Sequence, residues 1–267
     1  MVNPLPTVTI SASGNTTVCQ GSAVNLNAGS GTSYASYQWN LNGAPIAAAT
    51  TATFAATSTG SYSLTVTDAN GCSATSNTVS VTIRELPVAT ITGNPAICQG
   101  GSTILSANTG TGRTYQWKRN NVNIIGATTA NYTAITAGTY TVTVTSNTCS
   151  ATSNAITVTV NSLPTVSVSA TGSTSFCPGG SVVLTASTDP ANTLQWRKNG
   201  VNITGATGIS YTASDSGNYT VRVTSPAGCS ANSNGTSIIL LPNATASISA
   251  SICQGQTYAF GSQSLTA

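Results

Sequence analysis

The chain repeats itself, and the length of the period limits its possible folds more than any other feature. Three sets of marker residues return at a nearly constant spacing. They are Cys19, Cys98, Cys177 and Cys253, spaced by 79, 79 and 76 residues; Trp39, Trp117 and Trp196, spaced by 78 and 79; and Cys72, Cys149 and Cys229, spaced by 77 and 80. A period of this length is that of a small domain, so the sequence predicts a tandem array.

The markers, together with Leu-Pro pairs near the junctions, divide the chain into copies. Repeat 1 is expected over residues 1–85, repeat 2 over 86–163 and repeat 3 over 164–242, and residues 243–267 are expected to be the truncated start of a fourth repeat. The first residues, Met1 to Pro6, lack the basic and apolar regions of a signal peptide. We therefore interpret the chain as a slice of a longer array.

Within each repeat, short segments of period-two hydrophobicity alternate with turns rich in Gly, Asn, Ser and Pro. In repeat 3 the pattern predicts strands over residues 165–170, 181–186, 193–198, about 209–213, 219–224 and 229–240. A turn is expected at Asn199-Gly200, and no segment has a helical period. This pattern is typical of an all-β sandwich.

Charge is nearly missing from the chain, which argues against most functions that need it. The 267 residues include seven Lys and Arg, four Asp and Glu and no His, whereas Ser and Thr together number 84. Without His the commonest general base is lacking, so we expect the chain not to be an enzyme. The net charge of +3 is too small and scattered for a nucleic-acid surface. No run of 18 apolar residues could form a membrane span.

Metal and cofactor sites are not expected either. The four carboxylates are isolated in the sequence and cannot supply the six or more oxygens of a calcium site. No two cysteines are closer than 24 residues, whereas zinc ligands come in closely spaced pairs. The sequence therefore predicts no cofactor.

Each repeat carries motifs that resemble those of immunoglobulin-like domains. In repeat 3 the run Trp196-Arg197-Lys198-Asn199-Gly200 resembles the strand C tryptophan of that fold, and Asp215-Ser216-Gly217-Asn218-Tyr219 resembles its D-x-G-x-Y corner. The resemblance covers all three repeats, although repeats 1 and 2 lack the Asp. It implies tandem immunoglobulin-like β-sandwiches arranged head to tail as a rod. The implied core and corner residues are Trp39, Trp117, Trp196, Tyr62, Tyr140 and Tyr219.

The chain departs from the family at the disulfide that usually joins the two sheets. Apolar pairs stand in its place: Ala28 with Leu64, Ala107 with Val142, and Ala186 with Val221. We expect these pairs to pack under the tryptophans.

The wider pattern is similar to the tandem modules of giant secreted surface proteins of gliding and related Bacteroidota. It places C-x-G before the second strand and a cysteine followed by serine after the strand that carries the corner tyrosine. Residues 252–262 resemble a second repeat type of the same proteins. The resemblance implies a secreted cell-surface protein that acts in adhesion and gliding. Its implied partners are further copies of the repeat in cis, surface polysaccharide or other cells.

Seven cysteines in such an array indicate structural disulfides, because no His is present to activate a thiol. Pairs within one repeat would be Cys19–Cys72, Cys98–Cys149 and Cys177–Cys229. In an immunoglobulin-like sandwich these partners lie near opposite ends, roughly 20 Å apart, whereas a disulfide tolerates a Cα separation of only about 7 Å. We therefore prefer pairs between consecutive repeats.

The preferred pairs are Cys19–Cys149 and Cys98–Cys229, because the end of one repeat faces the start of the next in a head-to-tail array. Three cysteines, Cys72, Cys177 and Cys253, would then have partners outside the slice. The pairs within a repeat stay open at this stage, because a shifted strand assignment could bring those cysteines together.

The few basic residues gather beside two of the three tryptophans. Lys118 follows Trp117 and Arg197 follows Trp196, and Arg222 is expected to point outward from the neighbouring strand. These side chains are either solubilising charges or a weak patch for acidic polysaccharide.

The sequence favours a structural or adhesive array of a secreted bacterial surface fibre, without catalysis. Two alternatives stay open. One is a subunit of a self-assembling extracellular filament, favoured by the low charge, and the other is a spacer of a large secreted enzyme.

Overall fold

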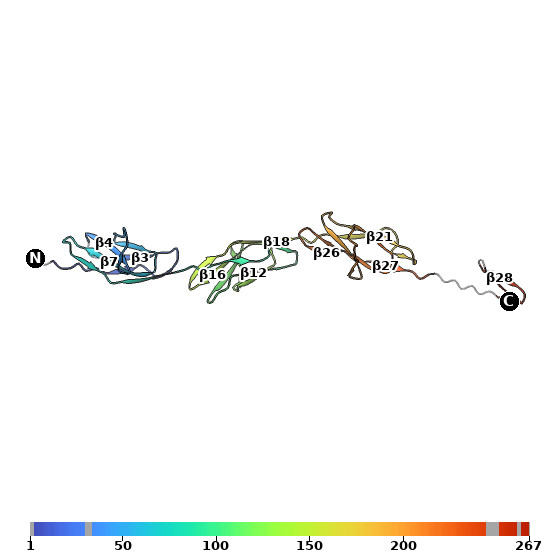
Figure 1. Ribbon diagram of the computed structural model, residues 1–267, viewed down its shortest axis with the longest axis horizontal. Coiled ribbons are helices and arrows are strands. Elements are labelled where there is room, and N and C mark those ends of the chain that lie inside the picture. The colour runs from blue at the N-terminus through green and yellow to red at the C-terminus, as the bar shows by residue number, and fades with distance from the viewer. Residues whose placement is uncertain (1–2, 30–33, 244–250, 261–262, 267) are drawn as a thin grey trace. The chain divides into compact units, whose positions relative to one another are not determined.

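The computed structural model of the chain describes residues 3–29, 34–243, 251–260 and 263–266. Every regular element in these ranges is a β-strand, and they contain no helix (Figure 1). The contacts of the chain fall into two compact units, Met1–Val160 and Asn161–Ala267.

The first sandwich of the unit Met1–Val160 consists of two sheets. The smaller sheet has the strand order β1-β3-β6 and contains β1 (Ile10–Ala12), β3 (Val24–Ala28) and β6 (Thr53–Ala56). The larger sheet has the order β2-β9-β7-β4-β5, with β8 also pairing with β7. Its strands are β2 (Thr17–Cys19), β4 (Ser36–Leu41), β5 (Ala44–Pro45), β7 (Gly60–Thr67), β8 (Ser73–Thr75) and β9 (Val79–Arg84). β2 runs parallel to β9, whereas the other pairs are antiparallel.

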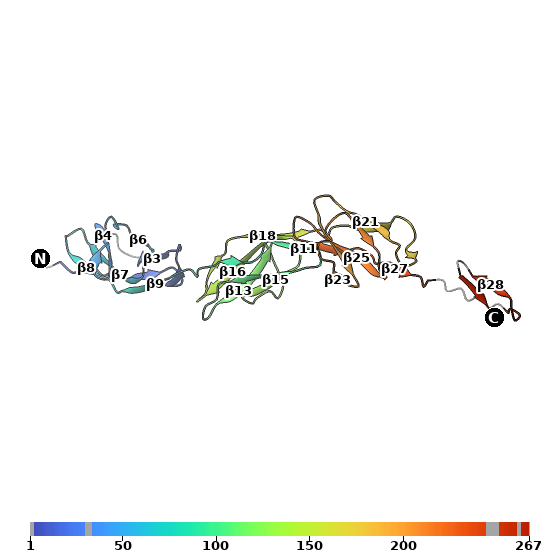
Figure 2. The ribbon, with the colours of Figure 1, turned by 45° about the vertical axis from the view of Figure 1, so that its right-hand side comes forward.

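The second sandwich repeats this topology (Figure 2). Its smaller sheet, in the order β10-β12-β15, contains β10 (Ile91–Thr92), β12 (Thr103–Ala107) and β15 (Asn131–Ala134). Its larger sheet, in the order β11-β18-β16-β13-β14, contains β11 (Ala96–Cys98), β13 (Thr114–Arg119), β14 (Val122–Asn123), β16 (Gly138–Ser146), β17 (Cys149–Thr152) and β18 (Ile156–Asn161).

The unit Asn161–Ala267 holds a third sandwich with the same two strand orders. Its smaller sheet contains β19 (Ser167–Ala170), β21 (Val182–Ser187) and β24 (Ser210–Ala213). Its larger sheet contains β20 (Ser175–Phe176), β22 (Thr193–Lys198), β23 (Val201–Asn202), β25 (Gly217–Thr224), β26 (Ser230–Asn232) and β27 (Thr236–Leu240). A separate hairpin follows, made of β28 (Thr257–Phe260) and β29 (Gln263–Thr266). The strand orders are those of immunoglobulin-like sandwiches, so the chain is an all-β tandem of this fold.

The strands of the third sandwich agree with the sequence pattern except in two respects. The pattern did not predict β20 or β23, which have two residues each and are too short to show a period. It also predicted one strand over 229–240, where the structure has β26 and β27. The break comes at Ser233, whose Oγ accepts a hydrogen bond from Val221 N at 3.0 Å. Ser76 and Ser153 make the same bond to Leu64 N and Val142 N in the other sandwiches.

Three aromatic rings form a column in the core of each sandwich. In the first, Phe54 packs against Trp39 and Tyr62 with ring centroids 5.8 and 5.9 Å apart. The tryptophans are fully buried, and each donates its indole N–H to a backbone oxygen at 2.8 to 3.0 Å. The equivalent columns are Trp117–Tyr132–Tyr140 and Trp196–Tyr211–Tyr219. Because aromatic side chains bury the most area per residue, these columns dominate each core.

The apolar pairs that replace the inter-sheet disulfide lie within these cores. Leu64, Val142 and Val221 have no exposed area, and Ala107 and Ala186 are buried. Ala28 is only half-buried, but it packs against the first core.

The last ring of each column closes the corner at the start of the strand that carries it. Tyr219 donates its hydroxyl to the carbonyl oxygen of Asp215 at 3.1 Å. Tyr62 and Tyr140 make the same bond to Ser58 and Thr136, at 2.8 and 2.9 Å. Burial raises the pKa of Tyr219 above its ordinary value.

We expect the substitution Tyr219→Phe to lower the free energy of unfolding of the third sandwich by about 1 kcal/mol, because Asp215 O loses its donor. The matched substitution Tyr211→Phe should cost much less, since Phe54 occupies this place in the first sandwich. Native-state hydrogen exchange of the amides in β25 measures both. Equal losses for the two variants would contradict the assigned role of the corner hydroxyl.

The raised pKa of Tyr219 predicts the direction of a pH effect. Folding favours the neutral phenol, so its contribution to stability is complete below the unfolded pKa of about 10 and is lost as the pH rises through the folded pKa. The third sandwich should therefore lose stability in alkali, and less steeply in Tyr219→Phe. Hydrogen exchange is too fast at this pH, so chemical denaturation monitored by fluorescence is the suitable measurement.

Candidate functional site

A disulfide joins the first sandwich to the second within the unit Met1–Val160. It links Cys19 and Cys149, whose Cα atoms are 5.6 Å apart although 130 positions separate them in sequence. This is one of the two pairs expected for a head-to-tail array of immunoglobulin-like sandwiches. The bond makes the junction between these two sandwiches the clearest candidate for a functional feature.

Cys19 reaches the junction because β2 runs parallel to the last strand of its sandwich. Cys19 lies opposite Arg84, the final residue of β9, and Gln20 N donates to Arg84 O at 2.7 Å. A turn at Gly21, with φ of 90°, then carries the chain back towards β3. The cysteine therefore lies at the end of the sandwich from which the chain leaves.

Cys149 is presented by a tight hairpin between β16 and β17. The turn residues Asn147 and Thr148 have φ of 48° and 73°, and Ser146 pairs with Cys149 across the turn. Positive φ at both central residues is the geometry of a two-residue hairpin of type I′. Cys149 is 1% exposed, so its sulfur is enclosed at the junction.

A hydrogen bond crosses the junction beside the disulfide. Arg84 donates its Nη1 to the carbonyl oxygen of Asn147 at 2.8 Å. Arg84 lies opposite Cys19, and Asn147 lies in the turn that precedes Cys149. The disulfide and the hydrogen bond therefore connect the same two segments, the paired strands β2 and β9 of the first sandwich and the β16–β17 hairpin of the second.

The states of the other cysteines exclude the pairing within repeats. Cys98 and Cys229 are both disulfide-bonded, whereas Cys72, Cys177 and Cys253 are free. Cys19 and Cys149 are bonded to each other, which rules out Cys19–Cys72 and Cys98–Cys149. The free state of Cys177 rules out Cys177–Cys229.

The basic residues singled out in the sequence are only partly brought together. Arg197 on β22 and Arg222 on β25 lie on the same outer face, with Arg197 opposite Thr220 and Arg222 opposite Gln195. Both are engaged within the sandwich, because Arg197 donates to Gly200 O and Arg222 to Ser230 Oγ. Lys118 lies on β13, in the sheet of another sandwich. Arg197 and Arg222 therefore share one outer face of the third sandwich, whereas Lys118 belongs to the second sandwich.

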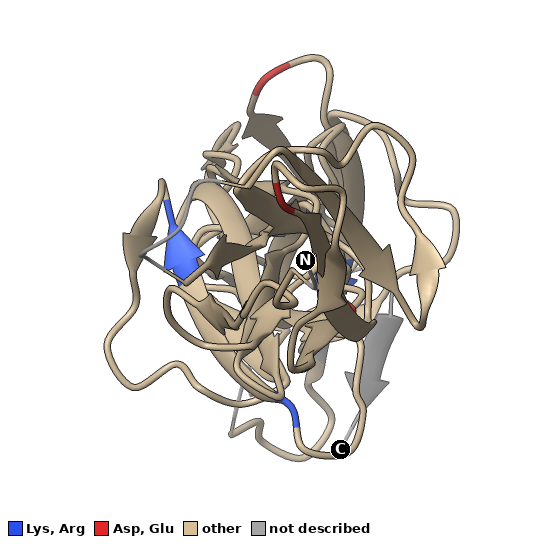
Figure 3. Ribbon diagram, turned by 90° about the vertical axis from the view of Figure 1, so that its left-hand side faces the viewer, with Lys and Arg blue, Asp and Glu red and all other residues tan. Residues whose placement is uncertain are grey.

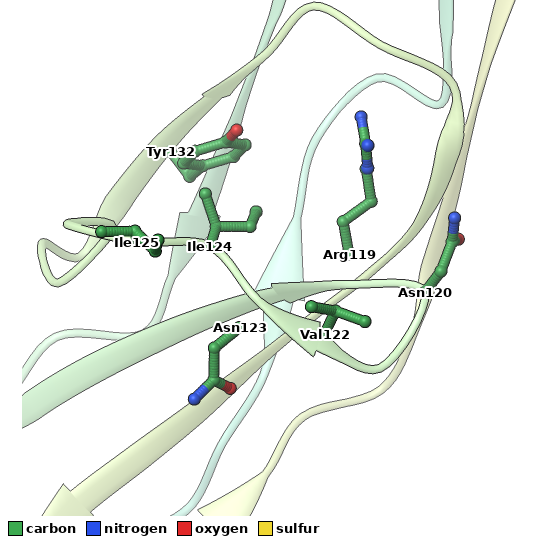
Figure 4. A pocket seen from close by; sticks show the side chains of 7 residues that line it. All are labelled: Arg119, Asn120, Val122, Asn123, Ile124, Ile125 and Tyr132. Atoms are coloured by element: carbon green, nitrogen blue, oxygen red, sulfur yellow. The ribbon is translucent and has the colours of Figure 1, made fainter.

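A surface pocket in the second sandwich was missed by the sequence analysis (Figure 4). It has a volume of about 530 Å³. Its lining comes from the hairpin between β13 and β14, the loop that follows, and β15. The lining residues are Arg119, Asn120, Val122, Asn123, Ile124, Ile125 and Tyr132.

The described part of the chain has neither a metal-binding cluster nor a membrane-spanning helix. It holds no cluster of three or more His, Cys, Asp or Glu that could bind a metal ion. None of its elements is a helix long and apolar enough to cross a membrane.

Comparisons with known proteins give matches at the level of single repeats and of tandem arrays. A family model described as a domain of unknown function, DUF8696, matches residues 88–162. No curated protein sequence matches the chain.

Several solved structures are similar over most of the chain. The I-band fragment I67–I69 of titin is 13% identical, over 84% of this chain and 95% of that one, with a TM-score of 0.40. The N-terminal eight Ig domains of DSCAM are 16% identical, over 88% of this chain and 37% of that one, with a TM-score of 0.41. Extracellular domains 3–5 of Drosophila OTK are 15% identical, over 89% of this chain and all of that one, with a TM-score of 0.32.

The cysteine states predict the outcome of chemical labelling. Alkylation of the unfolded, non-reduced protein should modify Cys72, Cys177 and Cys253 and leave the other four cysteines unmodified. Peptic digestion and mass spectrometry should then recover a linked peptide that contains Cys19 and Cys149. A peptide that links Cys19 to Cys72 would contradict the structure.

Proposed function

We propose that this chain is a force-transmitting segment of a secreted bacterial surface fibre, with an adhesive or structural role and no catalysis. The observation that carries the proposal is the Cys19–Cys149 disulfide between two successive sandwiches. Tandem immunoglobulin-like domains are typical of structural and adhesive extracellular proteins.

The disulfide changes the path of a pulling force through the chain. Tension that arrives at Cys19 from the N-terminal side passes directly to Cys149, because the covalent bond is the shorter connection. The residues between them, which include the cores around Trp39 and Trp117, then carry little of the load. Even if these sandwiches open, the chain between the two cysteines cannot be extended.

The other bonded cysteines fit the same scheme. We assign Cys98 and Cys229 to each other, because they stand in the same relation along the sequence as Cys19 and Cys149. The two closed loops would overlap, since Cys98 lies inside the first loop and Cys149 inside the second. Repeated along an array, such bonds would join successive domains into a stiff rod.

Compartment and surface composition support a secreted location. Structural disulfides persist in oxidising environments outside the cytosol. Figure 3 shows how few segments carry charge, and the outer strands are rich in Ser and Thr. Together with the resemblance to surface proteins of gliding Bacteroidota, these features favour adhesion or gliding as the role of the fibre.

Single-molecule pulling tests the force path. In a Cys98→Ser/Cys229→Ser background only the Cys19–Cys149 bond remains, and pulling from the two ends should release less chain before reduction than after it. The difference should be about 450 Å, because the bond spans 130 positions and an extended residue covers about 3.5 Å.

Two controls decide the interpretation. Adding Cys72→Ser to the same background should change nothing, since Cys72 is a free thiol. Adding Cys19→Ser and Cys149→Ser should give the longer release without reductant. If the oxidised and reduced chains release the same length, the proposed force path is wrong.

A further inference from the structure

The pocket of the second sandwich is built around a position that differs in each repeat. This position is the last residue of the strand that carries the buried tryptophan, and it lies opposite the corner tyrosine. It is Leu41 in the first sandwich, Arg119 in the second and Lys198 in the third. In the first sandwich this position is apolar and in the other two it is cationic. The chemical environment of the cation decides what each of these positions can bind.

In the third sandwich the cation is neutralised by its own fold. Lys198 Nζ lies 3.1 Å from Asp215 Oδ2, and this is the one ion pair among the residues that the structure describes. The hydrogen bond that Lys198 donates to the Asp215 carboxylate raises the pKa of Lys198 above its ordinary value. The positive charge there already has a carboxylate partner.

In the second sandwich the carboxylate is missing. Thr136 stands where the third sandwich has Asp215, since the carbonyl oxygens of both accept the hydroxyl of the corner tyrosine. Arg119 donates to Thr136 Oγ1, a neutral acceptor. The guanidinium therefore carries a charge that no acid of the described chain balances.

The walls of the pocket are fixed by the fold. Ile124 N donates to Trp117 O at 2.9 Å, and Ile124 O accepts from Gln116 Nε2 at 2.9 Å. Asn120 Oδ1 accepts from Thr139 N at 2.9 Å, which holds the amide beside Arg119. Figure 4 shows Ile124 next to Tyr132 on one side of the pocket and Arg119 on the other. Such a site needs little reorganisation when a ligand binds.

The lining has an apolar and a polar part. Val122 and Ile125 are 69% and 99% exposed, so they offer apolar surface to a ligand. Arg119 and the asparagine amides supply hydrogen-bond donors on the other side. A sugar ring has an apolar face and polar edges, and a uronic acid adds the carboxylate that a guanidinium binds best.

We propose that this pocket binds an acidic saccharide, with the carboxylate of a uronic acid on Arg119 and the sugar ring against Ile124 and Ile125. The proposal goes beyond force transmission and does not depend on it, because the pocket belongs to the second sandwich alone. It also differs from the positions of Lys118, Arg197 and Arg222, which lie on outer sheet faces.

Titration of the whole chain with trigalacturonate, followed by amide NMR shifts, tests this assignment. We expect saturable shifts in residues 119–125. The uncharged methyl ester of the same trisaccharide should bind about 10- to 100-fold more weakly, because it lacks the charge-assisted hydrogen bonds.

Matched variants are supplied by the other two repeats. Arg119→Leu gives the residue of the first sandwich, and Thr136→Asp gives the acid of the third. Both should weaken binding of trigalacturonate about tenfold or more while the remaining amide spectrum stays native, because a charge-assisted contact is lost or blocked. Lys198→Leu, made at the equivalent position of the third sandwich, should leave the affinity unchanged.

Several results would overturn the proposal. They are an absence of shifts at millimolar trigalacturonate, full affinity in Thr136→Asp, and equal binding of the methyl ester. Tighter binding of a triglutamate peptide than of trigalacturonate would assign the pocket to acidic peptides instead. None of these outcomes would change the length released in the pulling experiment, so the two proposals fail separately.

Discussion

The packing of a buried tryptophan against two further aromatic rings is the interaction on which each sandwich depends. A domain of fewer than 80 residues buries a small core, and the residues that the structure describes add a single ion pair to the three cores. The column spans both sheets, because Trp39 lies on β4 and Tyr62 on β7 of one sheet while Phe54 lies on β6 of the other. The same column holds the two sheets together where other immunoglobulin-like domains use a disulfide.

The Cys19–Cys149 disulfide joins two sandwiches and does not cross the interior of either one. Cys19 lies on the short strand β2 and Cys149 follows a two-residue turn, and both lie at the ends of their sandwiches. The aromatic column packs the interior of each domain, and the Cys19–Cys149 disulfide adds a connection between the first two.

Much of this arrangement could be predicted from the sequence, because the period aligns residues that do the same task. The tryptophans, the corner tyrosines and the Cys19–Cys149 relation all recur at fixed spacing. The two-residue strands and the middle rings Phe54, Tyr132 and Tyr211 were missed, since a short edge strand shows no period and the middle ring changes type. The pocket at Arg119 was missed for another reason. The side chain that contacts Arg119 is that of Thr136, which is 17 positions away in the sequence and is brought next to it only by the fold.

Comparison of the three repeats separates what the fold requires from what it leaves free. Each sandwich has the aromatic column, the corner hydroxyl bond and the serine that breaks the last strand, although the middle ring of the column is Phe in the first sandwich and Tyr in the other two. The pair of residues beside the corner differs in each sandwich, while the backbone around it keeps its register. The pair is Leu41 and Ser58 in the first sandwich, Arg119 and Thr136 in the second, and Lys198 and Asp215 in the third. A position that varies in charge on a constant scaffold is not needed for folding. The rim beside the corner tyrosine is therefore where charge differs between the repeats while the register of the strands stays the same.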